Sequence, residues 1–181
     1  MTSDSVPILT QFVRPEEITE DLLLALVECW SEVSNAGGAA GFPFPPVDSV
    51  EVTAAVKRLI AGLSPTGSRL IVAMVDGGLV GWLNLRCDAH PLVAHWGTLH
   101  HVQTRLDVRG QGIGAGLVRR ARDVARDEMG LEQLHLAARG GVGLEEFYGR
   151  LGWQEIGRWP GALRLADGDD CDEVLMLLSP L

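Results

Sequence analysis

Glycines at alternate positions mark residues 109–115, RGQGIGA, which join a predicted strand to a predicted helix. Glycine lets the backbone turn tightly and approach a ligand closely. The free amides at the start of the helix then point at an anion, most naturally a phosphate. Arg109 adds positive charge beside them, and Arg105 and Arg119 are weaker candidates for the same role. A glycine-rich turn without a ligand is the alternative.

Two common nucleotide-binding folds do not match this segment. A P-loop needs a lysine directly after its last glycine, and Lys57 is the only lysine of the chain. A dinucleotide-binding fold needs G-x-G-x-x-G early in a repeated strand–helix–strand pattern. Residues 110–116 instead read G-x-G-x-G-x-G and follow a run of strands. Neither fold is predicted.

The remaining periodicity predicts a single α/β domain, with one mixed sheet and helices on both faces. Thr19 is the expected N-cap of the first helix, and Asp48 with Glu51 resembles a capping box at the second. The glycines and prolines of residues 35–46 exclude regular structure between these helices. The expected elements, in order, are a strand at 7–13, helices at 19–34 and 48–62, strands at 69–75, 79–86 and 96–106, a helix at 112–129, a strand at 131–138, a helix at 144–151, and strands at 153–159 and 174–178.

Composition and charge narrow the partners. The 181 residues include 15 basic and 24 acidic ones, a net charge of −9, and 46% are hydrophobic. We therefore expect no binding to nucleic acid or to anionic membranes, whereas a cationic small molecule would be attracted. Residues 22–27 form an apolar run that no other run of the chain exceeds in length, and they are far too short to span a membrane.

Several absences favour a cytoplasmic protein without a metal. The cysteines are widely spaced and form no C-x-x-C pair, so neither a disulfide framework nor a zinc site is expected. Residues 1–7 lack the basic cluster and apolar core of a secretory signal. His90, His95 and His135 are isolated from other metal ligands in the sequence. The scarcity of lysine is typical of a GC-rich bacterial genome.

Residues 104–117 (TRLDVRGQGIGAGL) and 147–153 (FYGRLGW) are two motifs in order, separated by a predicted helix and strand. Together they resemble the GCN5-related N-acetyltransferase (GNAT) family. The first resembles its acyl-CoA pyrophosphate loop, R/Q-x-x-G-x-G/A, although Leu106 stands where many relatives have proline. The second resembles its F-Y-x-x-x-G-F/Y segment. The resemblance covers residues 69–181 well and the N-terminal third by element order alone.

Further features resemble the tabtoxin-resistance type of acetyltransferase. These are the glycine-rich segment after the first helix, the triplets at 134–136 (LHL) and 146–148 (EFY), and the tail from 157–161 (GRWPG) through 167–168 (DG).

The family resemblance implies a mostly antiparallel sheet of about six or seven strands, splayed between the fourth and fifth. Acetyl-CoA would lie in the V between them, within a core at about 96–153, with the acceptor region at about 15–62. A homodimer is compatible with the family. The implied acetyl-CoA contacts are the backbone of Val102, Gln103 and Thr104 along the pantetheine and acetyl group, and the amides of Arg109, Gly110, Gln111, Gly112, Ile113, Gly114 and Ala115 at the pyrophosphate.

Tyr148, the only tyrosine, matches the family's general acid, which would protonate the departing thiolate. A tyrosine pKa of about 10 against a thiol pKa of about 8.5 leaves hydrogen bonding and full proton transfer both open. An aromatic core residue beside Phe147 is the structural alternative.

The acceptor amine must lose a proton, because an ammonium pKa of about 10.4 leaves about one part in 10³ as free amine at pH 7. His100 and His101 are adjacent on a predicted strand, so their side chains are expected on opposite faces. His100 matches the family better, since some relatives carry a histidine base there; a structural histidine is the alternative. Glu28 and Glu32 on the first helix are further candidates, or part of a solvated acidic face.

Phe42 and Phe44 are candidates for packing over the substrate, or they pin their loop to the core. Arg139 and the two glycines after it are placed to contact the cofactor.

The expected function is transfer of acetyl from acetyl-CoA to a primary amine of a small molecule, an antibiotic or toxin among the candidates. Direct attack in a ternary complex is expected, because neither motif contains a cysteine to carry the acyl group. A protein or peptide N-acetyltransferase, and a non-catalytic acyl-CoA-binding regulatory module, are the alternatives.

Overall fold

The computed structural model describes residues 6–37, 41–42 and 45–181, which form a seven-stranded mixed sheet flanked by helices. Short 3-10 turns precede α1 and α3. Within this part of the chain, no helix is long and apolar enough to cross a membrane. The elements, in chain order, are β1 (Ile8–Phe12), α1 (Glu20–Asn35), α2 (Ser49–Ala61), β2 (Ser68–Val75), β3 (Gly78–Cys87), β4 (Trp96–Thr104), α3 (Ile113–Asp123), β5 (Gln133–Arg139), α4 (Leu144–Gly149), β6 (Gln154–Ala166) and β7 (Asp169–Leu178).

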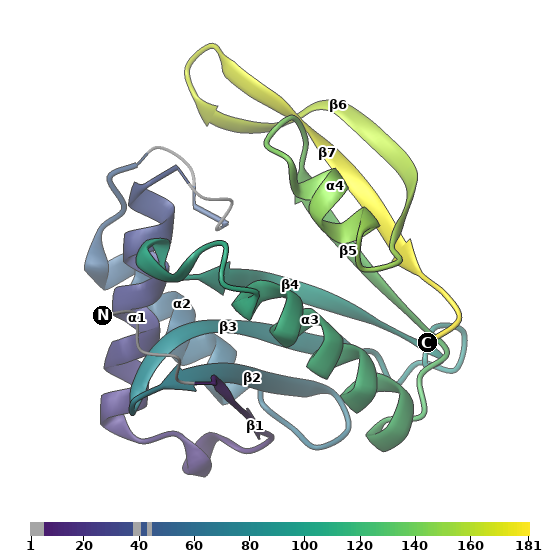
Figure 1. The fold of residues 1–181 in the computed structure, drawn as a ribbon, viewed down its shortest axis with the longest axis horizontal. Helices are drawn as coiled ribbons and strands as arrows, with labels where there is room; N and C mark the ends of the chain where they lie inside the picture. The colour runs from purple at the N-terminus through teal and green to yellow at the C-terminus, as the bar shows by residue number, and fades with distance from the viewer. Residues whose placement is uncertain (1–5, 38–40, 43–44) are drawn as a thin grey trace.

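The sheet divides into two arms between β4 and β5. Its strand order is β1-β2-β3-β4-β5-β7-β6, and every neighbouring pair is antiparallel except β4 with β5. That parallel pair is in register only where residues 96–98 meet residues 133–135. Beyond this vertex the strands diverge, so that β1–β4 form one arm and β5–β7 the other (Figure 1). The splayed mixed sheet implied by the resemblance is confirmed.

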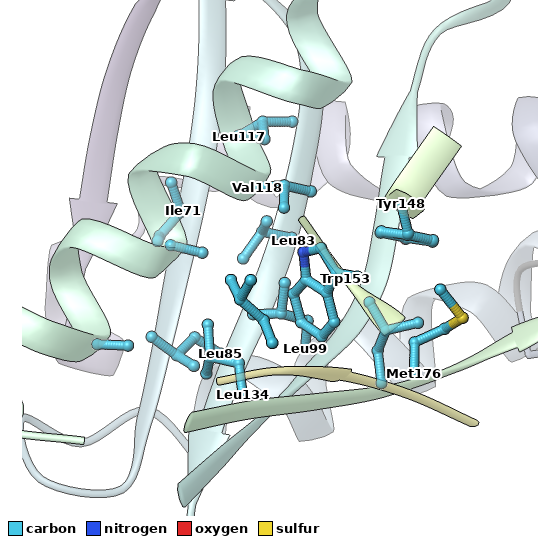
Figure 2. Close-up of a cluster of buried hydrophobic side chains, with 14 of the residues drawn as sticks. Ile71, Leu83, Leu85, Leu99, Leu117, Val118, Leu134, Tyr148, Trp153 and Met176 are labelled. Atoms are coloured by element: carbon cyan, nitrogen blue, oxygen red, sulfur yellow. The ribbon is translucent and has the colours of Figure 1, made fainter. Parts of the chain in front are cut away.

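Two apolar clusters place helices on opposite faces of the first arm. Helices α1 and α2 pack on one face, where Trp30 meets Trp82 of β3. Helix α3 packs on the other face through Leu117 and its neighbours. The α3 cluster also takes in side chains of the second arm, so that one core joins both arms (Figure 2); they include Leu134, Tyr148, Trp153 and Met176.

Local signals in the sequence correctly placed several element ends. Thr19 caps α1 by accepting a backbone hydrogen bond of 3.2 Å from the first turn. Asp48 caps α2 in the same way at 2.8 Å. Asp76 and Gly77 have φ values of 50° and 81°, the left-handed pair that a tight two-residue hairpin turn requires.

The β6–β7 hairpin is longer than predicted. Its strands extend beyond 153–159 and 174–178 and leave only residues 167–168 between them. Most of the added residues are exposed, so no apolar alternation reveals them in the sequence. Strand β6 contains Pro160, which it tolerates because it is the edge strand of the sheet.

One other predicted boundary is wrong, since strand β4 ends at Thr104 instead of 106, where a 3-10 turn begins at Leu106. The helix predicted to end at residues 129–130 is α-helical to Asp123 and continues as a π-helical turn to Glu128, with Met129 as its C-cap, so that its predicted end is confirmed.

Substituting Gly97 tests the close packing at the vertex. A Cβ atom there would lie 2.9 Å from the backbone oxygen of Arg86 and 2.9 Å from Cδ1 of Leu131. We expect Gly97→Ala to lower the free energy of unfolding by about 1–3 kcal/mol, as overpacking of a core does. Urea unfolding measures the change.

Gly116→Ala is the matched control within α3. The nearest atom to its added Cβ would be 4.0 Å away. Replacing a helical glycine should therefore raise the free energy of unfolding by about 0.5–1 kcal/mol. Wild-type stability of Gly97→Ala would contradict the packing described.

Candidate functional site

A cavity of about 1220 Å³ opens between the two arms. Its walls come from the diverging parts of β4 and β5, the first turn of α3, and α4. The end of α1 contributes Val33, Ala36 and Gly37, and the β6–β7 hairpin contributes residues 162–165 and Glu173. The cavity therefore brings together parts of the predicted acceptor region, at about 15–62, and of the predicted acetyl-CoA core, at about 96–153. It also includes the β6–β7 hairpin, which lies outside both.

The glycine-rich segment forms the α3 end of the cavity. Gly110 and Gly112 have φ values of 80° and 82°, and a Cβ atom at either would meet nothing within 4 Å. Within the described chain, the backbone amides from Gly112 to Ala115 donate no hydrogen bond, and the first turn of α3 contains no acidic residue. Free amides at a helix N-terminus favour an anion. These residues therefore fit a phosphate group.

The edge of β4 that faces β5 has no strand partner from Leu99 to Thr104 among the described residues. Backbone groups on such an edge must find water or a ligand. Gln103 lies on this stretch with 2% of its surface exposed, and neither its amide oxygen nor its amide nitrogen has a partner in the described chain. An unsatisfied buried polar group costs about 1–3 kcal/mol, so a polar ligand here would stabilise the protein.

The prediction that His100 and His101 face opposite sides of the sheet is wrong. The φ of His101 is 55°, and a register shift against β3 leaves Leu83 opposite two residues of β4. This bulge turns both imidazoles onto the α1 face, with ring centroids 6.0 Å apart. His101 packs 4.6 Å from Trp30 and 5.9 Å from Trp82, and both histidines line the cavity.

Both histidines are neutral at pH 7. Burial and the charge of Arg86 lower the pKa of His100 to about 4. Burial, His100 and Arg86 lower the pKa of His101 to about 4. A neutral imidazole can accept a proton, but with this pKa it holds the proton weakly.

Tyr148 is both a core residue and part of the cavity wall. It is 6% exposed and packs against Phe147 and Trp153, with ring centroids 4.9 and 5.8 Å away. Burial raises the pKa of its hydroxyl above the usual value. Tyr148 is therefore packed as an aromatic core residue, as the structural alternative expects, and it also lies beside the cavity.

Glu28 and Glu32 are bound by Arg105, which holds them at distances of 2.5 and 2.8 Å, and neither is among the cavity-lining residues. Arg105 also donates to the carbonyl of Leu79 at 2.8 Å. Glu32 accepts the backbone amide of Leu106 at 3.2 Å, a bond that proline at this position could not donate. These contacts attach the residues just before the glycine-rich segment to α1. The guanidinium of Arg105 is occupied by two carboxylates, so it is not free to bind the anion for which it was a candidate.

Phe42 packs on Trp30, with ring centroids 5.0 Å apart, and lines the cavity. Phe44 lies outside the described residues. Within the described chain, no group of three or more His, Cys, Asp or Glu is arranged to hold a metal ion.

The charged lining of the cavity is mostly arginine. Glu173 is the only acidic residue among the described lining residues. Arg139 donates to the carbonyl of Gly37 at 2.6 Å and so links the second arm to the end of α1. The sequence did not predict Arg150 and Arg164 as lining residues, because no local pattern distinguishes an exposed arginine that faces a cavity from one that faces solvent. The lining arginines are Arg109, Arg119, Arg139, Arg150 and Arg164.

The family model and the similar solved structures point to the same protein family. Residues 66–155 match the model of the acetyltransferase (GNAT) domain. None of the curated proteins matches the sequence significantly. Similar solved structures include a GNAT-family acetyltransferase from Streptococcus pneumoniae, 18% identical over 96% of this chain and 99% of that one, with a TM-score of 0.71.

Two further similar structures carry named activities. A ribosomal-protein-alanine N-acetyltransferase from Brucella melitensis is 19% identical over 95% of this chain and 99% of that one, with a TM-score of 0.72. An aminoglycoside 6'-N-acetyltransferase complexed with coenzyme A is 17% identical over 95% and 96%, with a TM-score of 0.70. These likenesses concern the fold, and the tabtoxin-resistance type stays a prediction. The matched domain, the two sequence motifs and the splayed sheet agree, and the chain belongs to the GNAT acetyltransferase family.

Proposed function

We propose that the protein transfers the acetyl group of acetyl-CoA to a primary amine of a small molecule. The observation that carries this proposal is the set of free amides from Gly112 to Ala115 at one end of the cavity, beside the unpaired edge of β4. The amides suit a pyrophosphate, and the strand edge suits an extended pantetheine chain. The similar fold of an aminoglycoside acetyltransferase complexed with coenzyme A supports this ligand.

A small acceptor is favoured over a protein or peptide by the contacts across the cavity. The bond between Arg139 and the carbonyl of Gly37 links β5 of the second arm to the residues after α1, and both residues line the cavity. In this proposal the link narrows the space between the arms for a protein segment, whereas a small amine has room beside it to reach the histidines. Similar folds serve both kinds of acceptor, since one of the similar structures is named as a ribosomal-protein-alanine N-acetyltransferase and another as an aminoglycoside 6'-N-acetyltransferase.

Acetyl-CoA supplies an acyl carbon for direct attack by the amine nitrogen and a thiolate as leaving group. In this proposal the backbone of Val102, Gln103 and Thr104 holds the acyl chain, and an amide on this edge stabilises the oxyanion. Tyr148 donates a hydrogen bond to the leaving sulfur. Its raised pKa favours hydrogen bonding over full proton transfer, because the hydroxyl is a weaker acid than a thiol.

His100 is the proposed acceptor of the amine proton, directly or through water. It faces α1 and lines the cavity, and burial keeps it neutral. Its pKa of about 4 makes transfer from an ammonium strongly uphill. The reactive acceptor is therefore the free amine, whose proton is lost as the new bond forms.

Calorimetric titration tests the ligand. We expect acetyl-CoA and desulfo-CoA to bind wild type with micromolar affinity and ATP to bind far more weakly. Gly112→Trp should abolish binding, because the tryptophan side chain would fill the open space in which the phosphates are proposed to lie. The left-handed φ of Gly112 is also unfavourable for any residue with a side chain. Gly130→Trp, also at positive φ with nothing within 4 Å, is the matched control and should bind normally. Failure of wild type to bind acetyl-CoA would remove the proposal.

Tyr148→Phe tests catalysis. Loss of one hydrogen bond to a developing thiolate should lower kcat about tenfold to a hundredfold, with little change in the KM for acetyl-CoA. Steady-state kinetics with an accepted amine measure both constants. An unchanged kcat would contradict a role for the hydroxyl, and absence of turnover in wild type would favour a binding module.

The pH profile tests the histidine. Since the pKa of His100 is about 4, it stays neutral from pH 5.5 upward and contributes no break near pH 6.5. We expect log kcat/KM for the amine to rise with a slope of about one toward the pKa of the amine. His100→Gln should lower the curve about tenfold without changing its shape, whereas His90→Gln, in an exposed loop, should leave it unchanged. A break near pH 6.5 that disappears in His100→Gln would contradict the lowered pKa.

A further inference from the structure

Two opposite charges face each other across the second arm of the sheet. Arg139, at the end of β5, lies directly opposite Glu173 of β7 in the strand register, and both residues line the cavity. Side chains opposed in this way share a face of the sheet, with their Cβ atoms about 5 Å apart. They form no ion pair with each other, and Arg139 instead reaches the carbonyl of Gly37 at 2.6 Å. Two complementary charges therefore lie side by side at the cavity without neutralising each other.

The alternation of side chains along β5 and β7 shows which face of the sheet this pair occupies. Every second residue of these strands points into the core that α3 covers, namely Leu134, Leu136, Ala138, Val174, Met176 and Leu178. Arg139 and Glu173 lie between or next to these residues in the chain, so they point to the opposite face. That is the α1 face, onto which His100 and His101 also turn. The pair is therefore on the side of the proposed proton acceptor, whereas the free amides belong to the start of α3.

Neither charge is compensated within the described residues. The Nε atom of Arg139 is buried without a partner, and the one hydrogen bond of its guanidinium there goes to the neutral carbonyl of Gly37. Glu173 is partly buried and forms neither an ion pair nor a side-chain hydrogen bond in that part of the chain. Partly buried charges without partners lower stability. A ligand that offers an anion to Arg139 and a cation to Glu173 would compensate both.

We propose that Arg139 and Glu173 bind the α-carboxylate and the α-ammonium group of a free diamino acid, whose side-chain amine accepts the acetyl group. This inference rests on the proposed function and names its substrate class. A free amino acid carries both charges on a single carbon atom, so neighbouring side chains of opposite charge can bind the two together. A guanidinium binds a carboxylate through two parallel hydrogen bonds, and a carboxylate accepts hydrogen bonds from an ammonium group. The ammonium group held by Glu173 keeps its proton, so the nucleophile must be the second amine.

Arg139 and Glu173 select the acceptor and take no part in the chemical step. The side-chain nitrogen of the diamino acid bonds to the acetyl carbon, and the bond from that carbon to sulfur breaks. The nitrogen loses its proton to His100 or to water, and the sulfur leaves as the thiolate of coenzyme A. An amine that lacks either charged group would leave one of the two residues without a partner, and that loss gives the specificity.

Acetylation of diamino acids and of their truncated analogues tests the proposal. The best acceptor among diaminopropionate, diaminobutyrate, ornithine and lysine is compared with the diamine that lacks its carboxylate and with the ω-amino acid that lacks its α-amine. We expect kcat/KM for the diamino acid to be about tenfold to a hundredfold higher than for either analogue, as loss of a hydrogen bond to a charged group implies. Mass spectrometry of the product should place the acetyl group on the side-chain nitrogen.

Substitutions test each charge against the analogue that does not use it. Arg139→Gln should reduce the preference for the diamino acid over the diamine to within about threefold, because neither acceptor then has a partner for a carboxylate. Glu173→Gln should reduce the preference over the ω-amino acid in the same way. Glu155→Gln is the matched control, since Glu155 lies on β6, is ion-paired with Arg158 and does not line the cavity. Both of its preferences should equal those of wild type.

Three results would overturn the inference and leave the proposed function intact. The first is a wild type that acetylates other amines but none of the four diamino acids. The second is acetylation at the α-nitrogen. The third is an equal loss of kcat/KM toward all three acceptors in Arg139→Gln and Glu173→Gln, which is the result of a merely structural role such as the link to Gly37. Failure of wild type to bind acetyl-CoA would overturn the proposed function as well.

Discussion

The short parallel pairing of β4 with β5 is the constraint on which the rest of this structure depends. Hydrogen bonding stops after three residue pairs, and Gly97 allows the tight contact at the vertex. Because backbone polar groups need hydrogen-bond partners, the facing edges of β4 and β5 beyond the vertex are available to bind a ligand. The same divergence opens the cavity and places the first turn of α3 at one end of it. One break in the sheet thus creates the space, the free strand edge and the position of the free amides.

A shared core keeps the diverging arms in a defined relation. Tyr148 and Trp153 of the second arm pack in the same apolar cluster as Leu117 of α3 (Figure 2). On the α1 side of the sheet, the ion pair between Arg105 and Glu32 attaches the segment before α3 to α1. Packing, more than exposed ion pairs, sets this geometry, since exposed pairs contribute about 0–1 kcal/mol. The proposed catalytic hydroxyl is therefore positioned by the same contacts that hold the arms together.

Charge is distributed unevenly over an acidic molecule. Several arginines are neutralised by nearby carboxylates, as in the pairs with Glu128 and Asp170. The last of these involves Arg164, which lines the cavity; the other lining arginines, at 109, 119, 139 and 150, form no ion pair within the described residues, and Glu173 is the one acidic residue among the described lining residues. Net charge predicts attraction of a cation, but the field inside a cleft follows its own lining. The expectation of a cationic acceptor, drawn from composition, therefore describes the outer surface, and the cavity suits a polyanionic ligand.

The sequence by itself determined the element order, the mixed sheet and the glycine-rich start of α3, because apolar periodicity, caps and backbone freedom are local properties. The splay of the sheet followed only from the resemblance of two motifs to a known family. It did not reveal the bulge at His101, which reverses the expected face of one histidine, since a positive φ there depends on packing against Trp30 and Trp82. Nor did it reveal the exposed half of the β6–β7 hairpin. The tertiary structure alone decided that Glu32 binds Arg105 and that Arg139 lies opposite Glu173 at the cavity. Such contacts join residues far apart in the chain, and no local pattern encodes which distant segments meet.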